Sequence, residues 1–269
     1  MHPILVEVFG IQIASFGLFM ILGAVAAWFL IHLLAGADGE KSGDISLVFL
    51  ICICGALAGA FALRPLMKIP EVIINWEHFR QMPVEVFFSY MFGEIVFYGG
   101  LAGGIVAMLI FCKSFKIPVV PIADLFAPAL AVAHGIGRIG CFLGGCCYGI
   151  PVSAAHPFAV TFPTASMGAP PGTPLLAIQL IEAASLFLIA AILVLVYKKT
   201  ASRIKGLTVS LYAALYSVLR FVLELYRGDP ARGIYGPFST SQYISLALFA
   251  VSAALIFMIA GKRKQSLNA

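Results

Sequence analysis

The segment "HGIGRIGCFLGGCCYGIP", residues 134–151, sets one arginine and three cysteines among glycines in a chain that is 61% apolar. The guanidinium of Arg138 carries a fixed positive charge and five N–H donors, which suit a phosphate or a carboxylate. Gly137 and Gly140 flank it, and glycines allow a backbone to turn back sharply and to expose its amides. We expect Arg138 to hold an anion together with these amides; the alternative is an arginine that anchors a loop to lipid headgroups.

The cysteines of this segment, Cys141, Cys146 and Cys147, allow three interpretations: a metal site, a disulfide, or small packing residues. Their C-x4-C-C spacing lacks the C-x2-C pairs of common zinc sites. Adjacent cysteines rarely bond to each other, although Cys141 could pair with either neighbour on the oxidising side of a membrane. We expect packing thiols and no bound metal, and the sequence leaves the redox state of the thiols open.

A second group of charges lies in "LRFVLELYRGD", where Arg220, Glu224 and Arg227 take relative positions 0, +4 and +7. Helical periodicity places all three on one face. Two arginines and one glutamate leave one positive charge over, which would suit the phosphate of a lipid. The alternative is an internal ion pair, with Arg227 reaching to the membrane interface.

Polar residues also interrupt a later apolar run. Gln179 and Glu182, in "AIQLIEA", are three residues apart and can share one face of a helix. Polar side chains at membrane depth are costly, so they predict a functional site. Simple hydrogen bonds between helices are the alternative.

Tyr98 opens the segment "YGGLAGG". A tyrosine at a membrane interface is usually part of the aromatic belt. Gly99 and Gly100 would leave room for a ligand beside it, although glycine patterns of this kind also let two helices approach closely. Tyr98, Gly99 and Gly100 are therefore site candidates, with helix packing as the alternative.

These residues need a membrane-spanning framework to position them. Only 11% of the 269 residues are charged, far below the quarter usual in soluble domains. A span needs about 20 apolar residues, and helices satisfy their backbone within lipid. We predict an all-α polytopic membrane protein with about seven transmembrane helices in a single integral domain, 1–269. The predicted spans are 12–35, 44–62, 95–112, 118–135, 178–197, 206–226 and 242–260.

The basic residues set the expected orientation. Lys198, Lys199 and the tail "GKRKQ" fall on one side of the predicted spans, together with most other lysines. The positive-inside rule therefore places the N-terminus outside and the C-terminus in the cytoplasm. This topology accounts for the formal net charge of +5, and nucleic-acid binding is not expected.

Two segments on the outer side are long. Residues 63–94 mix aromatic side chains such as Trp76 and Phe88 with charges, which suits a segment lying in the headgroup region. Residues 150–177 are rich in Pro, Gly, Ala, Ser and Thr, so we expect a mobile arm or a small head there.

Five motifs, "HPILVEVFGIQIASFGLFMILG", "FYGGLAGG", "GRIGCFLGGCCYG", "QLIEA" and "RFVLELYR", follow one another in the order found in a known family. Over nearly its whole length the chain resembles the prolipoprotein diacylglyceryl transferase family. The resemblance implies seven helices, with the N-terminus outside, in the bacterial cytoplasmic (inner) membrane. It also implies an enzyme that transfers the diacylglyceryl group of phosphatidylglycerol to the lipobox cysteine of a preprolipoprotein signal peptide. A thioether forms, glycerol phosphate leaves, and no cofactor is expected.

The resemblance carries roles to individual residues. Positions that match the family's motifs are Arg138, Gln179, Glu182, Arg220, Glu224 and Arg227. Arg138 corresponds to the family's essential arginine. The implied reaction needs a deprotonated thiol and cations that stabilise the leaving phosphate. We expect Arg138 and Arg220 to clamp the phosphate and Arg227 to anchor the headgroup.

The chain departs from the family's pattern at several positions. Tyr98 stands where many members have the His of H-G-G-L, and Phe16 replaces the Tyr of Y-G-L. In the signature G-R-x-G-N-F-x-N-x-E, Cys141, Gly144 and Cys146 replace Asn, Asn and Glu. Because a tyrosine with a pKa near 10 is a poor base at neutral pH, we prefer Glu224 as the general base, with Tyr98 orienting the headgroup or relaying a proton. The alternatives are a paralogue with another acceptor, and an anionic-lipid binder or transporter without chemistry.

Overall fold

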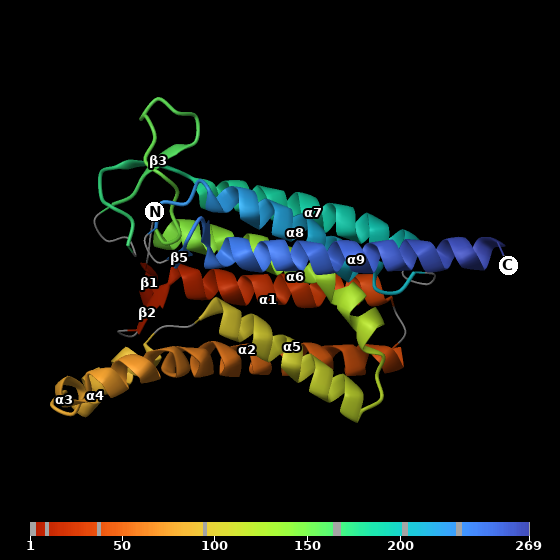
Figure 1. Ribbon diagram of the computed structural model, residues 1–269, viewed down its shortest axis with the longest axis horizontal. Helices are drawn as coiled ribbons and strands as arrows, with labels where there is room; N and C mark the ends of the chain where they lie inside the picture. Colours follow the sequence, from red (N-terminus) through yellow and green to blue (C-terminus); the bar gives the residue numbers. More distant parts are fainter. Residues whose placement is uncertain are drawn as a thin grey trace. The chain divides into compact units, whose positions relative to one another are not determined.

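The computed structural model describes residues 4–8, 11–36, 39–93, 96–163, 168–200, 204–229 and 233–268. Its helices are α1 (Ser15–Ala35), α2 (Gly39–Ile74), α3 (Trp76–Phe79), α4 (Val84–Phe92), α5 (Phe97–Ser114), α6 (Val119–Gly144), α7 (Ile178–Thr200), α8 (Leu207–Glu224) and α9 (Thr240–Asn268) (Figure 1). Its strands are β1 (Ile4–Val8), β2 (Ile11–Ala14), β3 (Ala159–Thr161), β4 (Pro174–Leu176), β5 (Ile234–Tyr235) and β6 (Phe238–Ser239), paired antiparallel two by two.

Within these ranges, seven helices are long and apolar enough to cross a membrane: α1, α2, α5, α6, α7, α8 and α9. This finding confirms the predicted all-α polytopic architecture. Three helices run well past their predicted ends: α2 continues to Ile74 through Pro65 and Pro70, α6 continues to Gly144 instead of ending near residue 135, and α9 continues to Asn268 instead of ending near residue 260. Proline and glycine favour helix ends in isolated segments, but a helix packed among neighbours in lipid tolerates both.

The chain forms two compact units, one of Met1–Gly36 with Ala123–Ala269 and one of Ala37–Ile122. In the first unit, α1, α6, α7, α8 and α9 run roughly side by side, and the pairs β3–β4 and β5–β6 lie near one end of this bundle (Figure 1). The prediction of a single integral domain over 1–269 stays a prediction.

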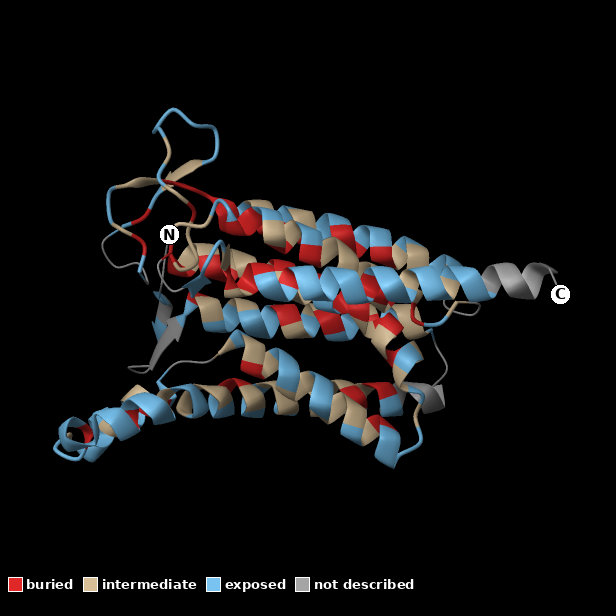
Figure 2. Ribbon diagram, viewed as in Figure 1, coloured by how far each residue is buried: buried red, intermediate tan, exposed pale blue. Residues whose placement is uncertain are grey.

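The surface of the first unit is apolar. Large side chains such as Leu188 and Leu195 on α7 are exposed, and exposed residues run along the outer sides of the helices (Figure 2). The interior holds small residues such as Ala131 and Ala190. Gly23 also lets α1 approach α6, because a Cβ at Gly23 would lie 2.9 Å from the carbonyl oxygen of Ala133. An apolar exterior around closely packed small residues is the arrangement expected of helices in lipid.

A buried carboxylate fixes the start of α8. Asp124, at the beginning of α6, is 2% exposed and accepts hydrogen bonds from the backbone amides of Gly206 and Val209. These amides belong to the first turn of α8, where backbone N–H groups lack partners within the helix. Asp124 therefore sets the position of α8, which carries Arg220 and Glu224, relative to α6.

In the second unit, glycines join α2 to α5. A Cβ at Gly99 would collide with the carbonyl oxygen of Gly59, and a Cβ at Gly103 would collide with that of Gly55. The described part of the predicted segment 63–94 contains the end of α2 with α3 and α4, held by a small cluster around Phe79. Its aromatic residues are partly turned outward, which suits the predicted interfacial placement; that placement stays a prediction.

The predicted arm or head, 150–177, is a small folded head in its described part, which omits 164–167. Strand β3 pairs with β4 in the register Ala159↔Leu176. Phe162 and Leu175 are almost fully buried and pack with Phe142, at the end of α6, and with Tyr148. Between the alternatives of mobile arm and small head, the buried apolar core favours the head.

Candidate active site

Three helices of the first unit meet around one buried carboxylate, that of Glu182 on α7. Its Oε1 lies 3.0 Å from Nη2 of Arg138 on α6 and accepts a hydrogen bond of 3.4 Å from the hydroxyl of Tyr216 on α8. Nε2 of His134 lies 3.9 Å from the same oxygen, and its ring contacts the Tyr216 ring edge-on. The predicted residues Arg138 and Glu182 are thus brought together, and Glu182 is the residue that orients the arginine.

Helical spacing explains this convergence. His134 and Arg138 are four residues apart on α6, and Tyr216 and Arg220 are four apart on α8, so each pair shares a helix face. His134 and Tyr216 were missed by the sequence analysis. An aromatic or imidazole ring one turn before each arginine was the available signal.

The second arginine also has a carboxylate partner. Nη2 of Arg220 lies 2.7 Å from Oε2 of Glu224 and donates a hydrogen bond of 3.0 Å to Oγ of Ser241 on α9. Glu224 lines a cavity of about 200 Å³ between the end of α8 and the start of α9, together with Phe238, Ser239 and Gln242. Of the three residues predicted to share one helical face, Arg220 and Glu224 lie on α8, and Glu224 borders this cavity. Arg227 lies beyond the end of α8 at Glu224, so its predicted place on that face is wrong.

The third arginine of the site corrects the expected charge balance. Arg227 makes a bidentate pair with Asp229, with Nε 2.8 Å from Oδ1 and Nη2 2.6 Å from Oδ2. Burial alone would lower the pKa of Arg227, but the hydrogen bonds to Asp229 raise it above its ordinary value. The positive charge expected to be left over from Arg220, Glu224 and Arg227 is therefore balanced by Asp229, which the sequence analysis had not used.

Several buried polar atoms at this site remain unused. Among the described residues, Nε of Arg138, Nη1 of Arg220 and Oε1 of Gln179 have no hydrogen-bond partner. Gln179 is fully buried, and its Nε2 donates to the carbonyl oxygen of Cys146 at 2.8 Å. Buried polar groups normally have partners, so two free N–H donors and one free acceptor in one region indicate a place for a polar ligand.

The glycines beside Arg138 act differently from the prediction. Gly137 and Gly140 lie within the continuous helix α6, so the expected sharp turn with exposed amides is wrong at these positions. A Cβ at Gly140 would lie 2.8 Å from Cβ of Phe19 and 3.4 Å from Cα of Phe16, so this glycine admits α1. The same contact places Phe16 beside the site-bearing part of α6. A role of Gly137 and Gly140 toward a substrate stays a prediction.

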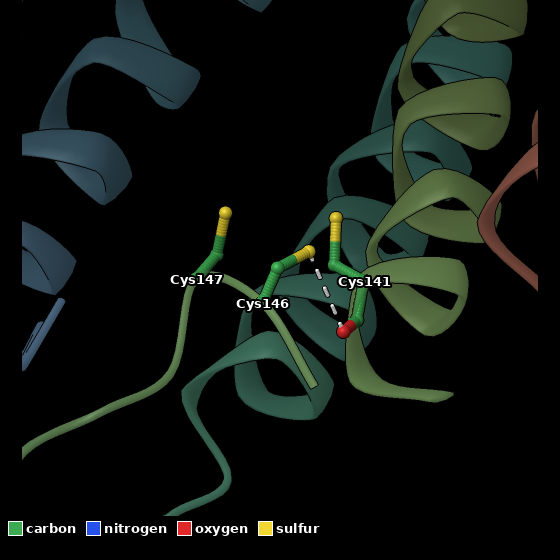
Figure 3. Close-up of side chains that lie close together, drawn as sticks. All are labelled: Cys141, Cys146 and Cys147. Atoms are coloured by element: carbon green, nitrogen blue, oxygen red, sulfur yellow. Dashed lines mark hydrogen bonds between the residues drawn. The ribbon is translucent and has the colours of Figure 1, made fainter. Parts of the chain in front are cut away.

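The backbone turns sharply only after the end of α6, in the segment from Gly145 to Cys147. Gly145 has φ +76° and Cys147 has φ +56°. The Sγ atoms of Cys141, Cys146 and Cys147, here called the thiol cluster, all lie within 4.8 Å of one another, and the three cysteines are free thiols (Figure 3). Hydrogen bonds with the other two thiols, together with the charges of Arg138 and Arg227, lower the pKa of Cys147 despite its burial.

The remaining candidates belong to the second unit. Tyr98 lies in the first turn of α5, and its ring contacts that of Phe97. Gly99 is buried where α5 meets α2, and a Cβ at Gly100 would lie 3.3 Å from the carbonyl oxygen of Ala56. Packing accounts for both glycines, and roles of Tyr98, Gly99 and Gly100 toward a substrate stay predictions.

The chain is similar to known proteins along nearly all of its length. The family model described as prolipoprotein diacylglyceryl transferase matches residues 3–258. A phosphatidylglycerol–prolipoprotein diacylglyceryl transferase of Clostridium tetani is 35% identical over 265 residues, which are 98% of this chain and 100% of the relative. Clostridium perfringens has two relatives with this name: transferase 2 is 35% identical over 96% of this chain and 95% of its own length, and transferase 1 is 26% identical over 98% of each. The family match and the identity across almost the full length show that the chain belongs to the prolipoprotein diacylglyceryl transferase family.

Proposed function

We propose that this protein transfers the diacylglyceryl group of phosphatidylglycerol to the lipobox cysteine thiol of preprolipoproteins. Its membership of the family and the activity for which its relatives are named support this function. The observation that carries the residue assignment is the buried pair of Arg138 and Glu182, in which Nε of Arg138 has no partner among the described residues.

The reaction is an alkylation of sulfur. A thiolate attacks the carbon of the diacylglyceryl group that bears the phosphate. The S–C bond forms as the bond between this carbon and the phosphate oxygen breaks, and glycerol phosphate leaves with the additional negative charge. Nε of Arg138 and Nη1 of Arg220 are the donors assigned to this phosphate. Glu182 and Glu224 hold the two guanidiniums in place, so the donors are oriented before the charge develops.

Two further residues act on the headgroup. Oε1 of the buried Gln179 is a free acceptor in the described structure and suits a hydroxyl of the headgroup glycerol. Arg227, held by Asp229, anchors the headgroup near the end of α8. Both roles place the polar part of the lipid at the Gly144 end of α6.

The acceptor thiol must lose its proton before it attacks. Glu224 remains our candidate for the general base, because its carboxylate lines the cavity between α8 and α9. Tyr98 is assigned the orientation of the headgroup or the relay of a proton, together with Gly99 and Gly100 at the start of α5.

The seven apolar helices make the chain a multi-pass membrane protein. We assign it to the bacterial cytoplasmic membrane, with the N-terminus outside and the lysine-rich C-terminus in the cytoplasm, on the strength of the positive-inside rule. In this orientation residues 63–94 rest at the outer membrane interface, residues 150–177 form an outer head, and lipids and signal peptides reach the site from the bilayer.

A reconstituted assay tests the proposal. The purified protein is mixed with phosphatidylglycerol and a lipobox peptide, and glycerol phosphate release and peptide mass are followed with wild type and Arg138→Ala. A thioether product that the variant fails to form supports the transferase. Release of glycerol phosphate without this thioether would favour another acceptor, which the Tyr98 and Phe16 departures would accommodate. Lipid binding without any product would favour a non-catalytic binder.

A further inference from the structure

The three cysteines of the thiol cluster lie close together in space but come from a helix and from the turn that follows it. Cys141 lies in the last turn of α6, and Cys146 and Cys147 lie in the turn that follows. Sγ of Cys146 points toward Cys141, 3.7 Å from its carbonyl oxygen (Figure 3). In the described part of the chain, these three residues are the group of potential metal ligands that lies close enough together to hold an ion.

The backbone is shaped to bring the thiols together. Cys147 has φ +56°, a conformation that is uncommon for a residue other than glycine. The turn is fixed by hydrogen bonds from the amides of Gly145 and Cys146 to the carbonyl of Cys141, and from Gln179 to the carbonyl of Cys146. An unfavourable conformation held by its surroundings is typical of functional sites, and small packing residues would not require it.

The distances suit a thiolate metal centre. A tetrahedral Zn²⁺ site with bonds of about 2.3 Å has sulfur atoms about 3.8 Å apart. The three Sγ atoms lie within 4.8 Å of one another, so rotations about the cysteine side chains bring them to that spacing. Soft thiolates select d¹⁰ ions such as Zn²⁺ or Cu⁺ over Mg²⁺ or Ca²⁺.

The charged side chains next to the thiol cluster are compatible with a metal cation bound between the three sulfur atoms. Arg138 and Arg227 are the guanidiniums that act on the cluster, but each is paired with a carboxylate, Glu182 and Asp229 respectively. Three thiolates and a divalent ion carry a net charge of minus one. The arginine pairs therefore neither repel the loaded cluster nor require another anion.

We propose that the thiol cluster binds one d¹⁰ metal ion through three cysteine thiolates, and that the fourth position on the ion takes the acceptor thiol. The described residues supply three ligands, which is the ligand number of catalytic zinc sites. The second part of the proposal rests on the proposed function. Coordination to the ion would deprotonate the acceptor thiol in a chain that has Tyr98 where many family members have a histidine.

The chemical step balances without an added oxidant or reductant. The acceptor thiol binds the ion as a thiolate and its proton passes to water, so that coordination takes the place of the general base otherwise assigned to Glu224. The S–C bond then forms as the C–O bond to the phosphate breaks, and the thioether leaves the ion as a weaker ligand. Gln179 links the two parts of the site, since its helix α7 also carries Glu182, the partner of Arg138.

Metal binding is tested without reference to activity. The full chain, reduced and freed of metal in detergent, is titrated with Cd²⁺, and the thiolate-to-metal charge-transfer absorption is recorded. We expect one Cd²⁺ per chain, loss of this equivalent in the triple variant Cys141→Ala, Cys146→Ala, Cys147→Ala, and its retention when Cys52, Cys54 and Cys112 are replaced by Ala instead. Equal titrations of both variants, or a disulfide within the cluster of the protein as isolated, would overturn the proposal.

Wild-type protein alone provides a second measurement, which stands even if the cluster variant fails to fold. X-ray absorption of the Zn²⁺-loaded protein should count three sulfur ligands, and four after addition of a lipobox peptide but not of its Cys→Ser analogue. If the number of sulfur ligands is the same with and without the peptide, the proposal that the acceptor thiol binds the ion is wrong. Thioether formation by a well-folded cluster-free variant at the wild-type rate would overturn it too, while leaving the proposed transferase intact. Loaded wild-type protein that makes no thioether would instead refute the proposed function.

Discussion

Replacement of Arg138 by lysine separates the charge of this residue from its geometry. In the structure Nη2 of Arg138 is engaged by Glu182 at 3.0 Å, and Nε has no partner among the described residues. A lysine keeps the positive charge but offers a single nitrogen. If that nitrogen keeps the contact with Glu182, it cannot also occupy the position of Nε, so the phosphate loses a donor.

The size of the effect follows from the loss of one preorganised donor. Removing such a donor from a developing oxyanion costs about 100- to 1,000-fold in kcat, or about 2.7–4 kcal/mol. We expect Arg138→Lys to lower the rate of glycerol phosphate release by this factor with phosphatidylglycerol and a lipobox peptide. Because the ion pair with Glu182 is retained, the variant should still fold, which its thermal denaturation in detergent checks.

Arg80→Lys is the matched control. Arg80 forms an exposed pair with Glu77, at 3.2 Å, and an exposed pair contributes little. We expect the rate of this variant to stay within about twofold of wild type. A well-folded Arg138→Lys protein that retains transfer within about tenfold would show that charge alone suffices, and the assignment of Nε to the phosphate would be wrong.

The remaining predictions concern other residues. Asp124→Ala should lower the stability of the protein by about 1–2 kcal/mol, because the first turn of α8 loses its cap; an unchanged melting temperature would contradict this role. Gly99→Ala should destabilise the α2–α5 contact by about 1–3 kcal/mol, and Gly100→Ala clearly less, since its nearest neighbour lies 3.3 Å away; equal melting temperatures of the two variants would refute this account. Glu224→Gln should lower kcat by about 100-fold or more with phosphatidylglycerol binding retained if Glu224 is the base, whereas near-normal kcat would leave deprotonation to the thiol cluster.

The membrane spans could be predicted because hydropathy is a property of each segment by itself. All seven predicted spans overlap the seven apolar helices of the described structure. The errors lie at ends marked by glycine or proline, where the outcome depends on the neighbouring helix. The sequence predicts a turn at the glycines beside Arg138, yet α1 packs against Gly140, and nothing in the sequence around Gly140 encodes this contact.

The ion pairs of the site are harder to predict from the sequence than the individual residues that form them. Arg138 and Glu182 are both candidates from the sequence, but they lie 44 positions apart in the chain, and no local spacing encodes their contact. Helical spacing relates residues three or four apart, so it does not predict the pairing of Arg227 with Asp229, which lies only two residues later. The sequence does not predict the backbone turn at Cys147, because a positive φ is uncommon at residues other than glycine.

The pairing of the arginines changes how the site must recognise a lipid phosphate. Arg138, Arg220 and Arg227 each have a carboxylate partner, so a phosphate does not enter a region with charge left over. What remains is a set of oriented donors, Nε of Arg138 and Nη1 of Arg220, which are unsatisfied among the described residues. Such donors interact most strongly with the oxygen that gains charge as the C–O bond breaks. A site that is neutral before the lipid binds therefore favours the transition state over simple accumulation of anions, which fits a transferase better than an anion carrier.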